Sequence, residues 1–224
     1  MRKPVIALDG YSSTGKSSIS KIIAKELGLV HMDTGALCRG ITYFALQNCL
    51  DEKGDINFPL LFEKLPTINL AFKKINDELT LFLNDQDISN EIRQKDISSK
   101  VSLIACQKEV RDFLLQTQRS IADEGGVILD GRDIGTVVLP NADFKFFITA
   151  SIEERTKRRF LELKSLGIEI TEEEVKHNLE TRDKIDSERV VAPLRKADDA
   201  ILIDNTLLTK LETVELILAK INQL

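Results

Sequence analysis

Short hydrophobic runs alternate with helical periodicity in the first fifty residues of the chain. The run VIAL at 5–8 predicts a buried strand, and residues 18–27 carry hydrophobic side chains at helical spacing. Residues 29–33 predict a second strand, and residues 34 to about 49 or 50 predict a second helix. The order strand, helix, strand, helix predicts a parallel sheet whose faces are covered by helices.

The pattern changes between residues 51 and 97. Hydrophobic and polar side chains alternate over 68–73 and again over 79–83, which is the periodicity of strands. We therefore expect a β-hairpin inside an insertion. Helical spacing then returns and predicts one long helix from 97 to about 123.

Three further strands are predicted in the second half of the chain. They cover 127–130, directly after a pair of glycines, then 144–149 and 200–204. A closing helix is expected over 209–222. Five strands that alternate with helices predict the α/β fold class with a five-stranded parallel sheet.

Two of the later helices have N-terminal signals. Ser151 with Glu154, and Thr171 with Glu174, have the spacing of a capping box, in which the two side chains bond each other's backbone amides. Helices are therefore expected to start directly after Ser151 and Thr171.

The first strand leads into a phosphate-binding loop. Residues 10–17, GYSSTGKS, fit the pattern G-x-x-x-x-G-K-[ST] between a strand and a helix that Gly28 ends. Successive amides of such a loop face a phosphate, and the helix N-terminus favours an anion. We expect Lys16 to reach the β- and γ-phosphates and Ser17 to offer its hydroxyl to Mg²⁺. The alternative is a plain glycine-rich turn, which the flanking strand and helix disfavour.

Composition narrows the class of protein. The 224 residues are 42% hydrophobic, which is enough for one domain with insertions, and the net charge of −5 argues against a general binder of nucleic acid or membranes. No hydrophobic run reaches membrane-spanning length, so we expect a cytoplasmic protein. Two histidines and three widely spaced cysteines leave little material for a metal centre. We expect His31 to be structural or to face solvent, and Cys49 and Cys106 to be reduced packing residues.

Arginines supply the strongest chemical signal after the loop. Eight of them fall in segments that could face the carboxyl edge of the sheet: Arg39, Arg111, Arg132, Arg155, Arg158, Arg159, Arg182 and Arg189. Arginine binds phosphate oxygens through paired N–H groups and keeps its proton, so such a cluster suits a site that holds several phosphates. For the three at 155–159, a solvated charged face is the alternative.

Three strand ends are expected to converge. Ligands of open α/β sheets bind outside the carboxyl ends of the strands, and Gly10, Asp33 and the pair Arg132-Asp133 all follow such ends. Phosphoryl transfer depends on positioned and neutralised charge, which this edge of the sheet would supply.

Several motifs occur in a characteristic order. They are LDG at 8–10 with the phosphate loop, DTGA at 33–36 with Arg39, DIS at 87–89 with IR at 92–93, Ser102 with VR at 110–111, DGRDIGTVV at 130–138, RD at 182–183 with Asp186, and RVVAPL at 189–194. In this order the chain resembles the bacterial cytidylate kinases, of the P-loop nucleoside-monophosphate kinase superfamily, over nearly its whole length.

The resemblance implies transfer of the γ-phosphoryl group of ATP to CMP or dCMP, with Mg²⁺, which gives ADP and CDP or dCDP. It implies that ATP is held by Gly10, Tyr11, Ser12, Ser13, Thr14, Gly15, Lys16, Ser17, Ser18 and Arg158. It implies that the acceptor is held by Asp33, Thr34, Arg39, Ser102, Arg111, Arg132, Asp133, Arg182, Asp186 and Arg189. The catalytic residues would be Lys16, Arg132, Arg155, Arg159 and Arg182.

Within the acceptor set the resemblance assigns separate roles. Arg39, Arg132 and Arg182 would hold the acceptor phosphate and the transferring group. Ser102, Arg111 and Asp133 would read cytosine. Asp186, with Arg182, would contact the sugar, although its spacing alone is equally typical of a structural salt bridge.

The resemblance also implies a division of the chain. Residues 1–50, 98–155 and 190–224 would form the P-loop core, 51–97 the monophosphate-binding insertion that contains the hairpin, and 156–189 a short lid with flanking helices. Arg155, Arg158 and Arg159 would serve the lid that closes over ATP. The expected partners are ATP, CMP and dCMP, with no nucleic acid and no membrane, and the expected state is a monomer.

One position departs from the family. Cys38 stands where these kinases usually have tyrosine, directly before Arg39. A buried packing residue is one interpretation of Cys38. The other is a reactive thiol, because the first turns of a helix and a neighbouring guanidinium favour the thiolate.

Two other functions stay open from the residues alone. One is a different small P-loop kinase, acting on another monophosphate or a small metabolite such as shikimate. The other is a nucleotide-binding switch with slow hydrolysis, although the sequence has no N-K-x-D guanine-reading motif. A dependence of ATP consumption on added CMP would distinguish a cytidylate kinase from both alternatives.

Overall fold

The computed structural model describes residues 2–75, 78–123 and 125–223. Contacts between Cα atoms group the chain into two compact units, one of Met1–His31 with Gly125–Leu224 and one of Met32–Glu124. Each unit is described by itself. The boundaries of core, insertion and lid expected from the sequence stay a prediction.

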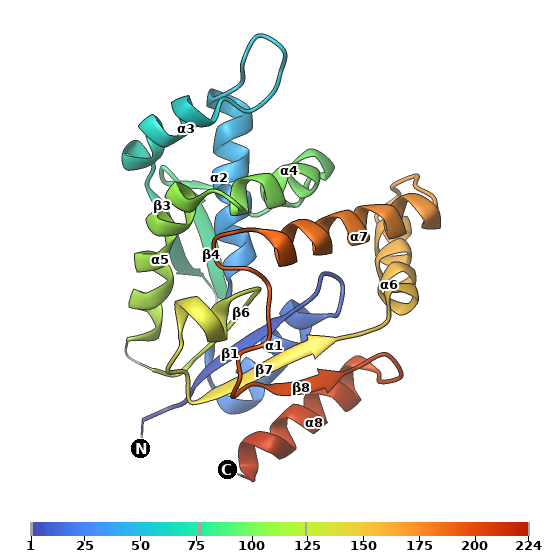
Figure 1. Cartoon of the computed structure of the whole chain (residues 1–224). Helices are drawn as coiled ribbons and strands as arrows, with labels where there is room; N and C mark the ends of the chain where they lie inside the picture. Colours follow the sequence, from blue (N-terminus) through green and yellow to red (C-terminus); the bar gives the residue numbers. More distant parts are fainter. Residues whose placement is uncertain (1, 76–77, 124, 224) are drawn as a thin grey trace. The chain divides into compact units, whose positions relative to one another are not determined.

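The first unit is built on a parallel sheet with the strand order β2-β6-β1-β7-β8 (Figure 1). The strands are β1 (Val5–Gly10), β2 (Val30–Asp33), β6 (Val127–Gly131), β7 (Phe144–Thr149) and β8 (Ile201–Asp204). The central strand β1 pairs with β6 on one side and β7 on the other, and β7 pairs with β8. The predicted α/β fold with five parallel strands is confirmed.

The first unit also contains helices. They are α1 (Lys16–Leu27), α6 (Ile152–Ser165), α7 (Glu172–Glu188) and α8 (Lys210–Asn222), with a π-helical turn η3 (Ile134–Val138) after β6. Side chains from β1, β6, β7 and β8 form one buried cluster with side chains from α1 and α8. In Figure 1, α8 accordingly runs alongside β8. Burial of each large aliphatic side chain there contributes on the order of 1.5–3 kcal/mol.

Predicted capping signals have different outcomes. Gly28 ends α1 in the left-handed conformation, with φ 60°, as expected. At α7 the capping box of Thr171 and Glu174 is complete. At α6 the prediction is half wrong: Ser151 Oγ accepts from Glu154 N, but Ser151 N donates to Thr206 Oγ1 at 2.9 Å. The Glu154 carboxylate instead accepts from Arg158.

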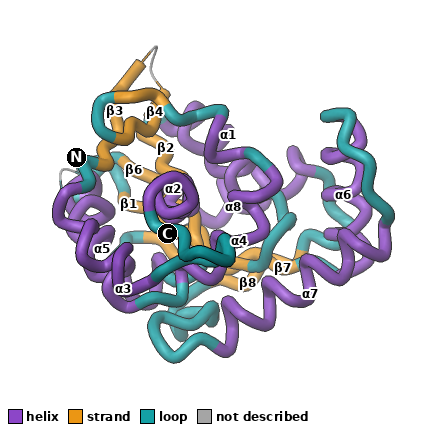
Figure 2. Tube along the Cα trace, turned by 90° about the horizontal axis from the view of Figure 1, so that it is seen from above, coloured by secondary structure: helices purple, strands orange, loops and turns teal. Residues whose placement is uncertain are grey.

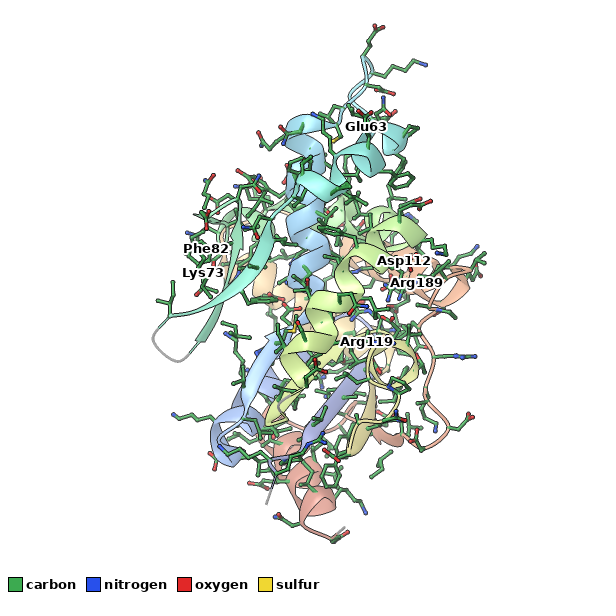
Figure 3. All side chains as sticks on the ribbon, turned by 90° about the vertical axis from the view of Figure 1, so that its left-hand side faces the viewer. Glu63, Lys73, Phe82, Asp112, Arg119 and Arg189 are labelled. Carbon is green, nitrogen blue, oxygen red and sulfur yellow. The ribbon has the colours of Figure 1, made fainter. Side chains whose placement is uncertain are left out.

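The second unit combines helices with the predicted hairpin. Its elements are α2 (Thr34–Asn48), α3 (Phe58–Lys64), η1 (Leu65–Thr67), β3 (Leu70–Ile75), β4 (Glu78–Leu83), β5 (Gln86–Asp87), η2 (Glu91–Arg93), α4 (Lys95–Ala105) and α5 (Lys108–Ala122). Strands β3, β4 and β5 form an antiparallel sheet, which confirms the hairpin, and β4, α4 and α5 pack against α2. Figure 2 looks down the axis of α2. On the hairpin, Lys73 Nζ lies 4.6 Å from the centre of the Phe82 ring (Figure 3).

One predicted helix is two helices. The single helix expected from 97 to about 123 is wrong, because the backbone turns out of the helical region at Gln107, where ψ is 126°. The hydrophobic phase explains the break. Buried Val101 and Ile104 of α4 share one side, but the buried Val110 and Leu114 of α5 would be turned by roughly 130° from them on a continuous helix. The two segments bury their hydrophobic faces only if the chain turns between them.

Candidate active site

The phosphate loop has the geometry that its sequence predicts. It starts at Gly10, the last residue of β1, where φ is 145° and an added Cβ would lie 2.0 Å from the carbonyl oxygen of Ile148. It ends at Gly15, which has φ 86° and precedes the first residue of α1. A β-carbon would therefore clash at Gly10 and would be strained at Gly15. The loop closes on the N-terminus of α1, where backbone amides suit an anion.

Lys16 is folded back onto its own loop. Its Nζ donates to Tyr11 O at 2.5 Å and lies 3.4 Å from Thr14 Oγ1, and the residue is only 6% exposed. Burial lowers the pKa of Lys16 well below its usual value, and Arg132 lowers it further. Burial and Arg132 thus disfavour the charged form of Lys16, and the negative charge of a bound polyphosphate would favour it.

Arg132 links the phosphate loop to α7. Its Nη2 donates to Ser12 Oγ at 2.7 Å, and its Nε donates to Asp186 Oδ2 at 3.0 Å. Arg189, at the end of α7, lies 4.0 Å from Asp186 Oδ1 and donates to Asp133 Oδ1 at 3.5 Å. The structure thus brings together four of the acceptor residues predicted from sequence.

Asp186 is a buried carboxylate among arginines. Burial alone would raise its pKa, but Arg132, Arg182 and Arg189 outweigh burial and hold the pKa of Asp186 below its ordinary value. The carboxylate therefore stays ionised in the neutral range. The salt-bridge interpretation of Asp186 holds in this structure, and contact with a sugar stays a prediction.

The three arginines of α6 differ in their surroundings. Arg155 is 6% exposed, forms an ion pair with Asp183, and donates to the carbonyl oxygens of Ser12 and Ala150 at 3.3 and 3.0 Å. Arg159 is half-buried and pairs with Glu162 within its own helix. A solvated charged face is therefore excluded for Arg155, whose guanidinium holds the phosphate loop in this structure.

Arg158 forms one wall of a cavity that sequence reasoning missed. The guanidinium donates to Glu154 Oε1, to Asn205 Oδ1 and to the carbonyl oxygens of Asn205 and Leu208. The cavity has a volume of about 430 Å³ and borders the phosphate loop. Its lining residues are Thr14, Gly15, Ile19, Glu154, Arg158, Asn205, Thr206, Leu207, Leu208, Thr209 and Lys210. Asn205 and Thr206 follow β8, so the carboxyl end of a further strand contributes to the site. Ligands of such sheets bind outside the carboxyl ends of the strands, and this rule could have pointed to both residues from the sequence.

Asp9 is a second residue that the sequence prediction missed. It is 4% exposed, and its two carboxylate oxygens accept from Ile134 N at 2.8 Å and Gly135 N at 2.7 Å. These bonds fasten the turn η3, which follows Arg132 and Asp133, to the end of β1. Burial raises the pKa of Asp9 to about 7, because the charged form loses more hydration than the two amides restore.

His31 and Asp130 form a buried pair. His31 Nε2 lies 2.6 Å from Asp130 Oδ1, and the two side chains are 11% and 7% exposed. The expectation of a structural His31 is confirmed, and the alternative of a solvent-facing ring is wrong. The pair connects β2 to the carboxyl end of β6.

The second unit carries the remaining predicted acceptor residues except Arg182, which lies on α7 of the first unit. Arg39 Nη2 donates to Asp33 Oδ2 at 2.5 Å, and Asp33 also caps α2 through Ala36 N. Thr34 is buried at the start of the same helix. Ser102 of α4 is 7% exposed, and Arg111 of α5 donates to Ala105 O at 3.5 Å. Their convergence with the first unit stays a prediction.

The three cysteines of the chain differ in burial. Cys49 is buried, as expected for a packing residue, and burial raises the pKa of its thiol. Cys38, within the first turns of α2, and Cys106 are both half-buried.

The donors available to a metal ion are oxygens. Within residues 2–75, 78–123 and 125–223, no group of three or more His, Cys, Asp and Glu side chains could hold a metal ion. The hydroxyl of Ser17 is half-buried on the first turn of α1, beside Lys16. A hydroxyl ligand fits Mg²⁺ that arrives with the phosphates of a nucleotide, since Mg²⁺ often takes most of its ligands from water and phosphate oxygens.

Among the helices described here, none is long and apolar enough to cross a membrane.

Known proteins match nearly the whole chain. The family model of cytidylate kinase matches residues 6–223. A cytidylate kinase of Bacillus cereus (strain B4264) is 44% identical over 214 residues, which are 96% of this chain and 94% of the relative. A cytidylate kinase of Bacillus cytotoxicus is 44% identical over 218 residues, 97% of this chain and 96% of that protein. The crystal structure of an uncharacterized protein from Eubacterium ventriosum is similar in fold alone, with TM-score 0.52 and 14% identity, and the match covers both chains fully.

Proposed function

Because the chain belongs to the cytidylate kinase family, we propose that it transfers the γ-phosphoryl group of ATP to CMP or dCMP. The observation that carries this proposal is the family match over residues 6–223, joined to a phosphate loop of the expected geometry. The products are ADP and CDP or dCDP.

ATP binds at the phosphate loop. The amides of residues 10–18 face its phosphates, and Lys16 turns from the Tyr11 carbonyl to the β- and γ-phosphates. The phosphates raise the depressed pKa of Lys16, so the bound state has a fully charged ammonium. The adenine base occupies the cavity of about 430 Å³ beside Thr14 and Gly15, against the guanidinium of Arg158.

The acceptor monophosphate is held by arginines. Arg39, Arg132 and Arg182 bind its phosphate and the transferring group, and Arg189 supports them through Asp133 and Asp186. Ser102, Arg111 and Asp133 read the cytosine edge, because cytosine offers a carbonyl acceptor and an amine donor where uracil offers two carbonyls and an N–H. Asp186, kept ionised by its arginines, accepts from the sugar hydroxyls.

Transfer depends on charge placed around the moving phosphoryl group. Lys16, Arg132 and Arg182, with Arg155 and Arg159 from the lid, neutralise charge that develops on its oxygens. Arg155 reaches this role only if it exchanges its contacts with Ser12 and Asp183 for contacts with the nucleotide. Closure of residues 156–189 excludes water, which would otherwise accept the phosphoryl group.

The conditions and partners belong to the same proposal. Mg²⁺ bound with the phosphates, and touched by Ser17, would supply further positive charge there. The enzyme works as a cytoplasmic monomer on small nucleotides and needs neither nucleic acid nor membrane.

The test is a coupled assay of ADP release with different acceptors. CMP and dCMP are expected to support turnover, whereas UMP should be at least about tenfold poorer in kcat/KM, because a mismatched buried polar group costs ~1–3 kcal/mol. AMP, shikimate and the absence of any acceptor are the controls. Faster turnover with AMP or shikimate would establish a different P-loop kinase, and hydrolysis independent of acceptor would establish a switch.

A further inference from the structure

Three carbonyl groups of the phosphate loop accept hydrogen bonds from side chains, one of them within the loop and two outside it. Tyr11 O accepts from Lys16 Nζ, and Ser12 O accepts from Arg155 Nη1. Thr14 O accepts from Asn205 Nδ2 at 2.9 Å. Asn205 lies 191 residues further along the chain and was described above only as a lining residue of the cavity and a partner of Arg158.

Asn205 is fixed on every side. It follows β8, is 1% exposed, and its backbone N donates to Thr149 O at 2.9 Å at the end of β7. Its Nδ2 donates to Thr14 O, and its Oδ1 accepts from Arg158 Nη1 at 3.1 Å. Because one end of the amide meets an acceptor and the other meets a donor, the side chain has a single satisfactory orientation.

Peptide geometry transmits this hold to the concave side of the loop. In a trans peptide the C=O and the following N–H point in opposite directions. The Thr14 carbonyl points at Asn205, so the amide of Gly15 points away from Asn205. Gly15 has φ 86°, and glycine also populates other regions readily, so this peptide plane would reorient at low cost without an external hold.

We propose that Asn205 is a positioning residue for the triphosphate of the donor, which it serves by fixing the Thr14–Gly15 peptide with the Gly15 amide directed at the phosphates. The inference rests on the proposed function, since it assumes that ATP phosphates occupy the loop. Asn205 itself touches no phosphate. It acts through the backbone of the loop, while the same side chain orients Arg158 at the wall of the cavity.

The deciding variant is Asn205→Asp, which has nearly the same shape. It keeps an oxygen for Arg158 but replaces the donor to Thr14 O with a second oxygen. The matched control is Asn57→Asp in the second unit, where the side-chain oxygen accepts from Leu60 N and aspartate caps equally well. The probe is inorganic tripolyphosphate, measured by isothermal titration calorimetry, because it occupies the loop without a base in the cavity.

The expected result is selective loss of phosphate binding. Tripolyphosphate affinity and 1/KM for ATP should both fall about tenfold or more in Asn205→Asp, while KM for CMP stays within about twofold of the wild type. Asn57→Asp should match the wild type in all three. In wild-type protein the Gly15 amide resonance should shift on addition of tripolyphosphate, and in Asn205→Asp this shift should be lost.

Other outcomes overturn the inference. Unchanged tripolyphosphate binding with a raised KM for ATP would mean that Asn205 only shapes the base cavity. A lower melting temperature with unchanged affinities would make it a purely structural residue. If Asn205→Asp does not fold, Asn205→Ser, which is too short to reach Thr14 O, is measured in the same way with the same criteria. Failure of the wild type to consume ATP in response to CMP would refute the proposed reaction and leave the tripolyphosphate result to decide the role of Asn205.

Discussion

The buried carboxylate of Asp9 should give the protein an unusual dependence of stability on pH. Its pKa is raised from 3.8 to about 7 in the folded state, so the folded protein keeps a proton that the unfolded chain releases. Protonation of Asp9 therefore stabilises the fold fully below about pH 3.8, and this contribution is lost as the pH rises through about 7. A difference of about three pKa units corresponds to ~4 kcal/mol of unfolding free energy.

The perturbation that isolates this contribution is Asp9→Asn, which cannot titrate. Urea unfolding of wild type and variant at intervals from pH 4.5 to 8 gives two profiles, and their difference removes the shared groups whose pKa does not depend on Asp9. Lys16 is not one of these groups, because the Asp9 carboxylate counteracts the lowering of its pKa by burial. Asp186 has a lowered pKa, so its contribution is present above pH 3.8 and is lost only as the pH falls below that value, outside this window. The wild type should lose stability relative to Asp9→Asn by ~3 kcal/mol between pH 4.5 and 7.5, since part of the total is already lost below pH 4.5.

The pH-independent difference in stability between the two proteins does not test the pKa of Asp9. It also contains the cost of placing the NH₂ group of asparagine against a backbone N–H of η3. The slope decides. Two parallel profiles would mean that Asp9 is ionised throughout this range, and that the two amide bonds outweigh its burial.

Three further predictions concern the site. Lys16→Ala should lower kcat more than about a hundredfold, because it removes the side chain that compensates phosphate charge. The melting temperature should not fall, because the variant also removes a buried amino group. Turnover and circular dichroism would measure the two effects. Asp186→Ala should raise KM for CMP much more than KM for ATP, measured with each substrate varied in turn. The variant should also lower the free energy of unfolding by ~3 kcal/mol, because Arg132 and Arg189 lose a buried counter-charge. Cys38 should be alkylated faster than Cys106 and much faster than buried Cys49, with protection by CMP, and Cys38→Tyr should lower KM for CMP, as mass spectrometry and kinetics would report.

Each of these has a result that contradicts it. Near-normal turnover of Lys16→Ala would remove the phosphate loop from the ATP site. Equal changes in both KM values for Asp186→Ala would return that carboxylate to a purely structural role. An inert, unprotected Cys38, with a Cys38→Tyr variant that does not fold, would make it a packing residue.

The sheet and most helices follow from the sequence because their signals are local. Hydrophobic runs mark the five strands, and a capping residue such as Thr171 marks the start of a helix through a partner three residues away. The break at Gln107 was missed because no glycine or proline marks it. Only the change in hydrophobic phase between Ile104 and Val110 indicates that two helices face their core separately. The short helix α3 was also missed, although Asn57 caps it.

Site residues divide in the same way. The phosphate loop and the arginines are recognisable from motif and residue type, and the structure gathers Arg132, Asp133, Asp186 and Arg189 as expected. The place of Asn205 after a strand end was a usable signal, but its contact with the loop could not be predicted, because this is a hydrogen bond to a backbone atom 191 positions away. Every residue has a backbone carbonyl, so the residue type at position 14 gives no sign that its carbonyl oxygen binds Asn205.

The two glycines of the phosphate loop would behave differently in a saturation library selected for folding before any selection for activity. At position 10 every larger side chain would place its β-carbon 2.0 Å from the Ile148 carbonyl oxygen, so β1 and β7 would have to separate, and only glycine should survive. At position 15 the β-carbon would meet only Ile19 Cδ1 at 3.6 Å, so the restriction is the positive φ alone. Asparagine and aspartate tolerate such a φ and should survive there. Selection for folding alone should therefore retain glycine at position 10, whereas at position 15 selection for phosphate binding is also needed to retain glycine.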